Sequence, residues 1–394
     1  MIVPFYGELL LQPIPLELSL NYCSHKCAYC FANLNKPDRR AAPQSIVNLL
    51  AECDERDTLE ARLLSERYPI LLSNKVDPFS ESNWRLTLQI LELLAALEVP
   101  VAFQTKGGKG LFEAMDLIKR SCFYFSITAQ DDETAKRIEP GAPSISKRFE
   151  MMAALRSKGH HVWAGVNPLV REWIPDVNGF ARRLAAEGVR HVFSEVLHLS
   201  RDQIANMSER EKEAVSPPVI KKASARSIPQ DSIDHELDFI DACRENGIEF
   251  ACKHWPEPTT VLEPYARCYP RRFPTMTEWT NHVWQTQEPG AELTFRDFFE
   301  FMSPLFPDIR NKSLGHYVHS CSRNLGRRIR FASGTCFEDI LRVIWIEREH
   351  RMNPSRSRAF KKKFELNAAG EKIFQMDDEG LPVRYFTGRK LERG

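Results

Sequence analysis

Three cysteines crowd into one short stretch near the start of the chain, which reads NYCSHKCAYCFANLNKP from residue 21. Cys23, Cys27 and Cys30 follow the spacing C-x3-C-x2-C. Three thiolates on one loop can hold three irons of a [4Fe–4S] cluster, because cysteine is the usual ligand of such clusters. The fourth iron would lack a local protein ligand and stay open to a substrate or cofactor. A zinc site is the alternative, with His25 as a fourth ligand inside the same loop.

The chain around this loop alternates strand-like and helix-like segments from residue 16 to about residue 255. Short apolar runs, often β-branched or aromatic, predict strands at 16–21, 69–74, 99–106, 122–129, 160–170, 190–199 and 248–255. Amphipathic runs predict helices at 45–68, 84–98, 109–121, 132–139, 144–159, 177–188 and 234–247. Repeated β-α units of this length predict a parallel sheet that forms a full or partial barrel. Sites in such barrels lie at the C-terminal ends of the strands, and the three cysteines directly follow the first predicted strand.

The cysteine motif, with an aromatic residue before its third cysteine (CSHKCAYC), resembles the signature of radical S-adenosylmethionine (radical SAM) enzymes. The resemblance implies an α/β fold of the partial (β/α)6-type parallel barrel, a [4Fe–4S] cluster on the three cysteines, and SAM chelated at the open iron. In that superfamily one electron from the cluster cleaves SAM to methionine and a 5′-deoxyadenosyl radical, which abstracts a hydrogen atom from the substrate. It also implies an external electron donor such as flavodoxin or ferredoxin.

Several stretches at the predicted strand ends are similar to the spore photoproduct lyase-like branch of this superfamily: SNKVDPF, QTKGG, FSITAQDDETAKRIEPGAPSISKRFEMMAAL and VNPLV. The similarity covers about residues 16–200 and implies cofactor contacts from Tyr29, Ser73, Asn74, Lys106 and Ser126. By this resemblance Lys106 contacts the carboxylate of SAM, and Ser126 contacts its ribose or carboxylate. Ser73 and Asn74 lie where the family binds the amino group. The backbone at Tyr29 meets the adenine, and Glu139 braces the site.

One position departs from the photoproduct lyases, which carry a hydrogen-donating cysteine near the end of the second strand. Here the stretch reads PILLSNKVDP, with Ser73 and Asn74 but no thiol. An O–H or N–H bond is too strong to replace the weak S–H donor, so we expect a substrate other than a thymine dimer. Cys252, at the end of the last predicted strand, is a candidate for a hydrogen donor at the mouth of the barrel.

The remaining cysteines fall into two groups. Those in predicted helices and strands are expected in the core: Cys53, Cys122 and Cys243. Those at or beyond the end of the barrel could hold a second iron–sulfur cluster or a structural zinc, with His254 as a further ligand: Cys252, Cys268, Cys321 and Cys336. Their wide spacing also fits scattered free thiols.

The chain has 394 residues, which suits a radical SAM partial barrel over 1–255 and a mixed, mainly helical C-terminal extension over 256–394. The formal net charge is only +1, but basic residues outnumber acidic ones from residue 310 onward. Basic side chains neutralise phosphates and aromatic ones stack on bases, so the extension could be a substrate clamp or lid over DNA or a nucleotide. Aromatic residues at this density are also expected in a core, and those near the basic segments are Tyr317, Phe331, Trp345 and Phe360.

The first residues lack the basic start of a signal peptide, and no run approaches the roughly 20 apolar residues that a membrane span needs. We therefore expect a cytoplasmic protein without a membrane partner. Three functions compete. The first is a radical enzyme that modifies or repairs a nucleic-acid base, the second a radical enzyme acting on a peptide or small metabolite, and the third a non-catalytic iron–sulfur protein.

Overall fold

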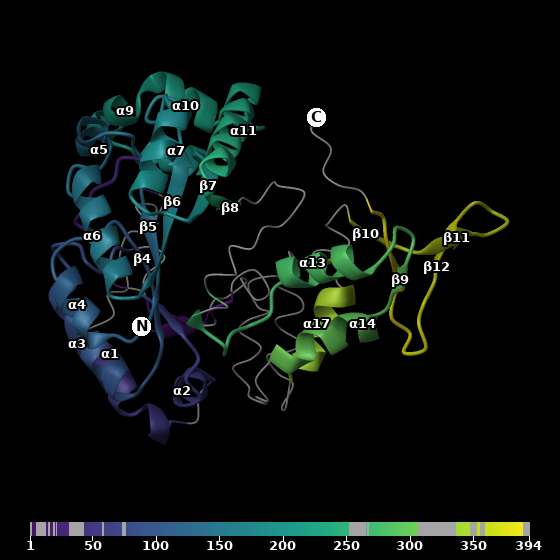
Figure 1. Ribbon diagram of the computed structural model, residues 1–394. Helices are drawn as coiled ribbons and strands as arrows, with labels where there is room; N and C mark the ends of the chain where they lie inside the picture. Colours follow the sequence, from purple (N-terminus) through teal and green to yellow (C-terminus); the bar gives the residue numbers. More distant parts are fainter. Residues whose placement is uncertain are drawn as a thin grey trace.

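The computed structural model describes residues 2–4, 13–14, 16–18, 20, 22–30, 43–56, 59–72, 76–251, 265, 268–305, 336–346, 353–354 and 359–388. A sheet with helices packed along it forms one part of the molecule, and a smaller mixed unit from the C-terminal extension forms the other (Figure 1). The boundary predicted near residue 255 lies outside the described residues and stays a prediction.

The main sheet has eight strands in the order β1 to β8. β1 (Ile2–Pro4) pairs antiparallel with β2 (Leu16–Leu18), and it was not predicted. Each later strand pairs parallel with the one before: β3 (Ile70–Leu72), β4 (Val101–Thr105), β5 (Cys122–Ser126), β6 (His161–Leu169), β7 (His191–Val196) and β8 (Glu249–Ala251). Within the described residues the sheet stays open, with β1 and β8 at its edges. The α/β class and the partial-barrel prediction are therefore confirmed.

Helices connect the parallel strands and pack their apolar faces on the sheet: α1 (Pro43–Ala51), α2 (Leu59–Ser65), α3 (Trp84–Ala96), α4 (Leu111–Leu117), α5 (Asp132–Ile138), α6 (Ile145–Ser157), α7 (Val177–Ala186) and α11 (Gln230–Glu245). The single helix predicted over 45–68 is wrong, because α1 ends before a 3-10 turn at Cys53–Glu55 and α2 starts anew. Three short helices after β7 were not predicted: α8 (Arg201–Asn206), α9 (Glu209–Val215) and α10 (Pro217–Ala223). No helix among the described residues has the length and apolar character that a bilayer crossing requires.

The interior of the partial barrel is filled at the N-terminal ends of the strands. Cys122, Tyr124 and Trp163 form a buried cluster there with Tyr269 from beyond β8. The Tyr269 hydroxyl donates to the carbonyl of Val101 at 2.6 Å and accepts from the backbone N–H of Cys122 at 2.8 Å. Because this end is packed shut, open space for a ligand is expected at the C-terminal ends of the strands.

The extension is mixed, as predicted. Its described helices are α13 (Met276–Thr286), α14 (Phe295–Met302) and α17 (Phe337–Ile346). A three-stranded sheet has the order β10 (Phe360–Lys362), β13 (Arg384–Phe386), β9 (Glu292–Leu293), and a separate hairpin joins β11 (Phe364–Leu366) to β12 (Lys372–Phe374). Trp345 and Phe360 are fully buried in its core. They are thus not available to stack on bases, and Tyr317 and Phe331 lie outside the described residues.

Candidate functional site

The cysteine loop (residues 22–30) follows β2 at the C-terminal edge of the sheet, and the α5–α6 turn holds it from one side. The backbone N–H of Gly141 donates to the carbonyl of His25 at 2.9 Å, and that of Ala28 donates to the carbonyl of Ile138 at 2.8 Å. The His25 ring nitrogen Nδ1 lies 3.0 Å from the carbonyl oxygen of Gly141. A Cβ atom at position 141 would lie 2.2 Å from the carbonyl oxygen of Ser24, so the close approach of the two segments requires glycine.

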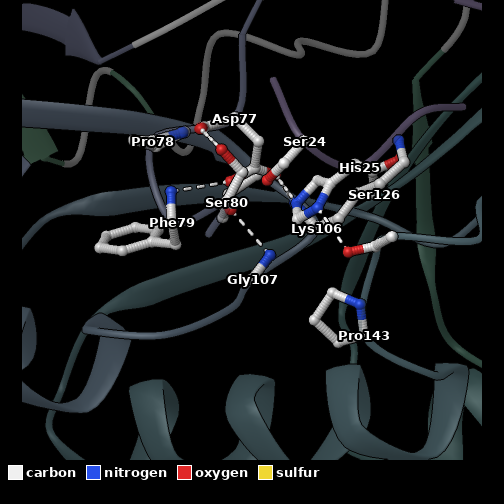
Figure 2. A network of polar contacts seen from close by, with 12 residues as sticks. Ser24, His25, Asp77, Pro78, Phe79, Ser80, Lys106, Gly107, Ser126 and Pro143 are labelled. Carbon is white, nitrogen blue, oxygen red and sulfur yellow. Dashed lines mark hydrogen bonds and ion pairs between the residues drawn. The ribbon is translucent and has the colours of Figure 1, made fainter. Parts of the chain in front are cut away.

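Asp77, between β3 and α3, joins the cysteine loop to the end of β4 (Figure 2). One carboxylate oxygen accepts from the backbone N–H of Lys106 at 2.6 Å and lies 3.2 Å from His25 Nε2, close enough for an ion pair but not aligned for a hydrogen bond. The other accepts from the Thr105 hydroxyl at 2.8 Å and from the backbone N–H of Phe79 at 2.9 Å. Burial favours the neutral acid, but His25 and these donors outweigh it and lower the pKa of Asp77.

Glu139, which directly follows α5, makes a second connection between the cysteine loop and Lys106 at the end of β4. One carboxylate oxygen accepts from the Tyr29 hydroxyl and, at 2.5 Å, from the Thr128 hydroxyl, and it lies 3.5 Å from Lys106 Nζ. The other oxygen pairs with the guanidinium of Arg148, and both partners of this pair are fully buried. Burial alone would raise the pKa of Glu139, but Arg148 and Lys106 hold it at about 2.

Lys106 lies between these two carboxylates. Its ammonium donates to the Ser126 hydroxyl at 3.0 Å and lies 5.8 Å from the centre of the Tyr29 ring. Burial favours the neutral amine, but the charges of Glu139 and Cys27 outweigh it and raise the pKa of Lys106. The raised pKa keeps the ammonium of Lys106 protonated, so it can attract an anionic group.

The three cysteines offer a donor set that fits an iron–sulfur cluster. Cys27 is buried, and Cys23 and Cys30 are half-buried. Burial raises the pKa of Cys23 and of Cys27, while the charge of Lys106 favours the thiolate of both. Among the described residues, no three Cys, His, Asp or Glu side chains converge as ligands of a single ion would. A [4Fe–4S] cluster needs a wider arrangement, because each thiolate binds a different iron.

A pocket of about 430 Å³ lies at the C-terminal ends of β6 and β7, where α10 and the start of α11 cover it. This volume is in the range of small-molecule sites. Glu195 lines the pocket and accepts from the Asn167 amide at 3.4 Å. Burial raises the pKa of the Tyr124 hydroxyl; the charge of Lys106 lowers this pKa and the charge of Glu195 raises it. A smaller pocket beside Tyr29 and Cys30 is lined by α8 and its flanking residues.

The structure brings four of the predicted site residues together: Tyr29, Lys106, Ser126 and Glu139. Ser73, Asn74 and Cys252 lie outside the described residues, so their predicted roles stay predictions. The sequence reasoning missed Asp77, Thr128 and Arg148. All three fall in or beside the quoted stretches, but their contacts join segments that are distant in the sequence.

The other cysteines divide as expected where the structure describes them. Cys53, Cys122 and Cys243 are buried, which confirms their place in the core. Cys268 packs against the cluster that contains Cys122, whereas the Cys336 thiol donates to Asp339 at 3.3 Å. Cys252, Cys321 and His254 lie outside the described residues, so a second metal site stays a prediction.

Comparison with known proteins gives a family match within the N-terminal part of the chain. Residues 18–172 match the family model described as the Radical SAM superfamily. A "Radical SAM Nalpha-GlyT isomerase" of Pseudomonas phage M6 is 27% identical over 197 residues, which cover 48% of this chain and 40% of that protein. An uncharacterized protein of Mycobacterium tuberculosis is 27% identical over 194 residues, 45% of this chain and 56% of the relative. The chain thus spans about half the length of these curated relatives.

Solved structures with a similar fold include a spore photoproduct lyase complexed with dinucleoside spore photoproduct. It has 17% sequence identity and a TM-score of 0.43, and the match covers 60% of this chain and 76% of that one. Streptococcus suis SuiB bound to precursor peptide SuiA has 15% identity and a TM-score of 0.39, over 66% of this chain and 52% of that one.

Proposed function

We propose, on the premise that residues 18–172 form a domain of the radical SAM superfamily, that this protein is a radical SAM enzyme acting on a base of DNA or RNA. The family implies a [4Fe–4S] cluster and SAM. When bound, the cluster supplies the electron that cleaves SAM to methionine and a 5′-deoxyadenosyl radical, which takes a hydrogen atom from the substrate. Cys23, Cys27 and Cys30 are the residues that would hold the cluster.

One observation carries the catalytic part of this proposal: two buried carboxylates each connect the cysteine loop to Lys106. Asp77 contacts His25 of the loop and the backbone N–H of Lys106. Glu139 contacts Tyr29 of the loop and the ammonium of Lys106. A site that must hold a cluster and a carboxylate-bearing cofactor side by side needs such a fixed relation between the thiols and a cation.

The cofactor roles proposed for individual residues follow from this arrangement. The ammonium of Lys106, oriented by the Ser126 hydroxyl at 3.0 Å, attracts the carboxylate of SAM. Arg148 pairs with the other oxygen of Glu139, so Lys106 is not the only cation that this carboxylate contacts. The backbone at Tyr29 would meet the adenine, as the resemblance to the family implies.

Two features favour a nucleic-acid base as the substrate. Basic residues outnumber acidic ones from residue 310 onward, which suits a polyanion. The second is the similarity to a phage protein named a radical SAM Nα-GlyT isomerase. A base can reach the interior beside Lys106 only after it leaves the stack, and the pocket of about 430 Å³ next to Glu195 can receive it.

The test is 5′-deoxyadenosine formation by the anaerobically reconstituted, dithionite-reduced protein, with and without short oligonucleotides. We expect cleavage of SAM that increases with the nucleic acid and a mass change in one base. Cleavage that is indifferent to oligonucleotides but increases with a peptide or metabolite would leave the radical chemistry in place and refute the substrate class. A protein that holds its cluster but never cleaves SAM would be a non-catalytic iron–sulfur protein.

A further inference from the structure

A two-stranded hairpin extends beyond the small sheet of the extension, on the side away from the main sheet (Figure 1). It consists of β11 and β12, and its tip is a tight turn from Asn367 to Gly370. The Asn367 side chain accepts from the backbone N–H groups of Ala369 and Glu371, both at 2.9 Å, and Gly370 supplies the positive φ of +76° that the turn needs. The tip is therefore a specified turn.

The base of the hairpin is held by the body of the extension. Backbone hydrogen bonds run from Gln375 to Lys363 at 3.0 Å and from Lys363 to Val383 at 2.9 Å, which continues the pairing into the small sheet. Phe360, next to this base, packs against Trp279 with the two ring centres 4.5 Å apart inside the core. The hairpin thus projects from a packed support.

One face of the hairpin combines aromatic and cationic side chains. Residues directly opposite in an antiparallel pair share a face, and the opposed pairs are Phe364 with Phe374 and Leu366 with Lys372. The ammonium of Lys372 lies 4.4 Å from the centre of the Phe364 ring, and that of Lys362 lies 5.5 Å from the centre of the Phe374 ring. We call these five residues the aromatic face. It contains two lysines and no acidic residue.

The apolar side chains of this face are open to solvent. The exposed fractions are 39% for Phe364, 44% for Phe374 and 63% for Leu366. On the opposite face Ile373 is also exposed, at 58%, but its opposed neighbour is the acidic Glu365. Clustered exposed apolar side chains often mark a surface that binds a partner, and of the two faces of this hairpin the aromatic face combines them with lysines.

We propose that the aromatic face is a contact surface for a nucleic-acid strand. Exposed phenylalanine rings can stack on unpaired bases of any sequence, and lysines beside them can reach the phosphates that connect those bases. This inference rests on the proposed function for the class of partner. It goes further by naming a surface in the extension, separate from the cysteine loop, that holds the strand.

A second copy of the chain fits this face less well. A twofold contact would place the same face of each copy against the other and bring Lys362 and Lys372 together with their counterparts. Five side chains on strands of three residues also offer far less area than the ~800 Å² per partner of a standard interface. Charge complementarity therefore favours a polyanion.

The test is fluorescence anisotropy with a labelled single-stranded oligonucleotide and the full-length reconstituted protein, for Phe374→Ala and for a matched control, Ile373→Ala. The two variants truncate adjacent exposed side chains of one strand but act on opposite faces. We expect Phe374→Ala to weaken binding about fivefold or more, the loss of one stacked base, and Ile373→Ala to leave it within about twofold. Lys372→Gln should lower the slope of log affinity against log salt by about 0.7.

Equal binding by wild type, Phe374→Ala and Ile373→Ala would overturn the proposal, as would an equal loss in both variants with correct folding by circular dichroism. Sedimentation that shows a dimer dissolved by Phe374→Ala would assign the face to a second copy instead. SAM cleavage without oligonucleotide should be the same in all variants. If wild type binds the oligonucleotide through this face but SAM cleavage does not respond to it, the proposed substrate is wrong and the contact surface stands.

Discussion

Replacing Asp77 with asparagine perturbs the contact between the cysteine loop and Lys106 without changing the size of the side chain. The carboxylate accepts three hydrogen bonds, from the backbone N–H groups of Lys106 and Phe79 and from the Thr105 hydroxyl, at 2.6, 2.9 and 2.8 Å. An amide has one oxygen and one NH2 group. In either orientation it therefore turns a donor toward one of the two backbone N–H groups.

The expected cost is one hydrogen bond to a charged acceptor, about 1.5–3 kcal/mol, and one buried N–H left unpaired, about 1–3 kcal/mol. His25 also loses its carboxylate neighbour. From the two hydrogen-bond costs together we expect a loss of about 3–6 kcal/mol in the free energy of unfolding. Less iron should be retained per protein after reconstitution, because the loop that carries the cysteines loses one of its supports.

The assay is urea unfolding of the apoprotein, together with iron and sulfide content after anaerobic reconstitution. The matched control is Asp176→Asn, since Asp176 caps the remote helix α7 through the backbone N–H of Gly179 at 2.8 Å and asparagine caps equally well. An Asp77→Asn protein that unfolds within about 0.5 kcal/mol of wild type and binds normal amounts of iron would refute the reasoning.

Four further changes have expected outcomes. Cys27→Ala should abolish the cluster, and visible absorption near the wild-type level after reconstitution would refute the ligand assignment. Lys106→Ala should weaken SAM binding while it spares the cluster, and unchanged affinity in equilibrium dialysis would rule out its proposed role. Gly141→Ala should lower iron retention, because its Cβ would lie 2.2 Å from the carbonyl oxygen of Ser24; wild-type iron content would show that the loop adapts. Burial raises the pKa of Glu236 to about 7, above its ordinary value of 4.5, so the folded state holds a proton that the unfolded state releases, and stability falls as pH rises between these values. Glu236→Gln should therefore remove a loss of about 3 kcal/mol between pH 4.5 and 7 in urea unfolding, and an unchanged pH profile would contradict the assignment.

The parallel sheet could be predicted because its strands are short apolar runs separated by amphipathic helices, a pattern that local sequence carries by itself. The break between α1 and α2 could not, since the apolar period continues across the 3-10 turn that contains Cys53. The capping boxes at Ser200 and Ser208 were visible signals for α8 and α9, in segments with few buried side chains. The amphipathic pattern is weak in both helices, so apolar spacing alone did not predict them.

The candidate site, too, could be predicted only where its signal lies within one short segment. The spacing of Cys23, Cys27 and Cys30 lies within one loop and is readable, whereas the role of Asp77 depends on three segments meeting in space. Trp345 shows a similar limit, because an aromatic residue beside basic ones reads equally as a base-stacking or a core residue until its burial is known.

The most direct test of the central claim is electron paramagnetic resonance of the reconstituted, dithionite-reduced protein, recorded with and without SAM. The account predicts a reduced [4Fe–4S] signal whose shape changes when SAM is added, because the iron without a cysteine ligand would bind the cofactor. A cluster signal that SAM leaves unchanged, or reduced protein without any iron–sulfur signal, would contradict it.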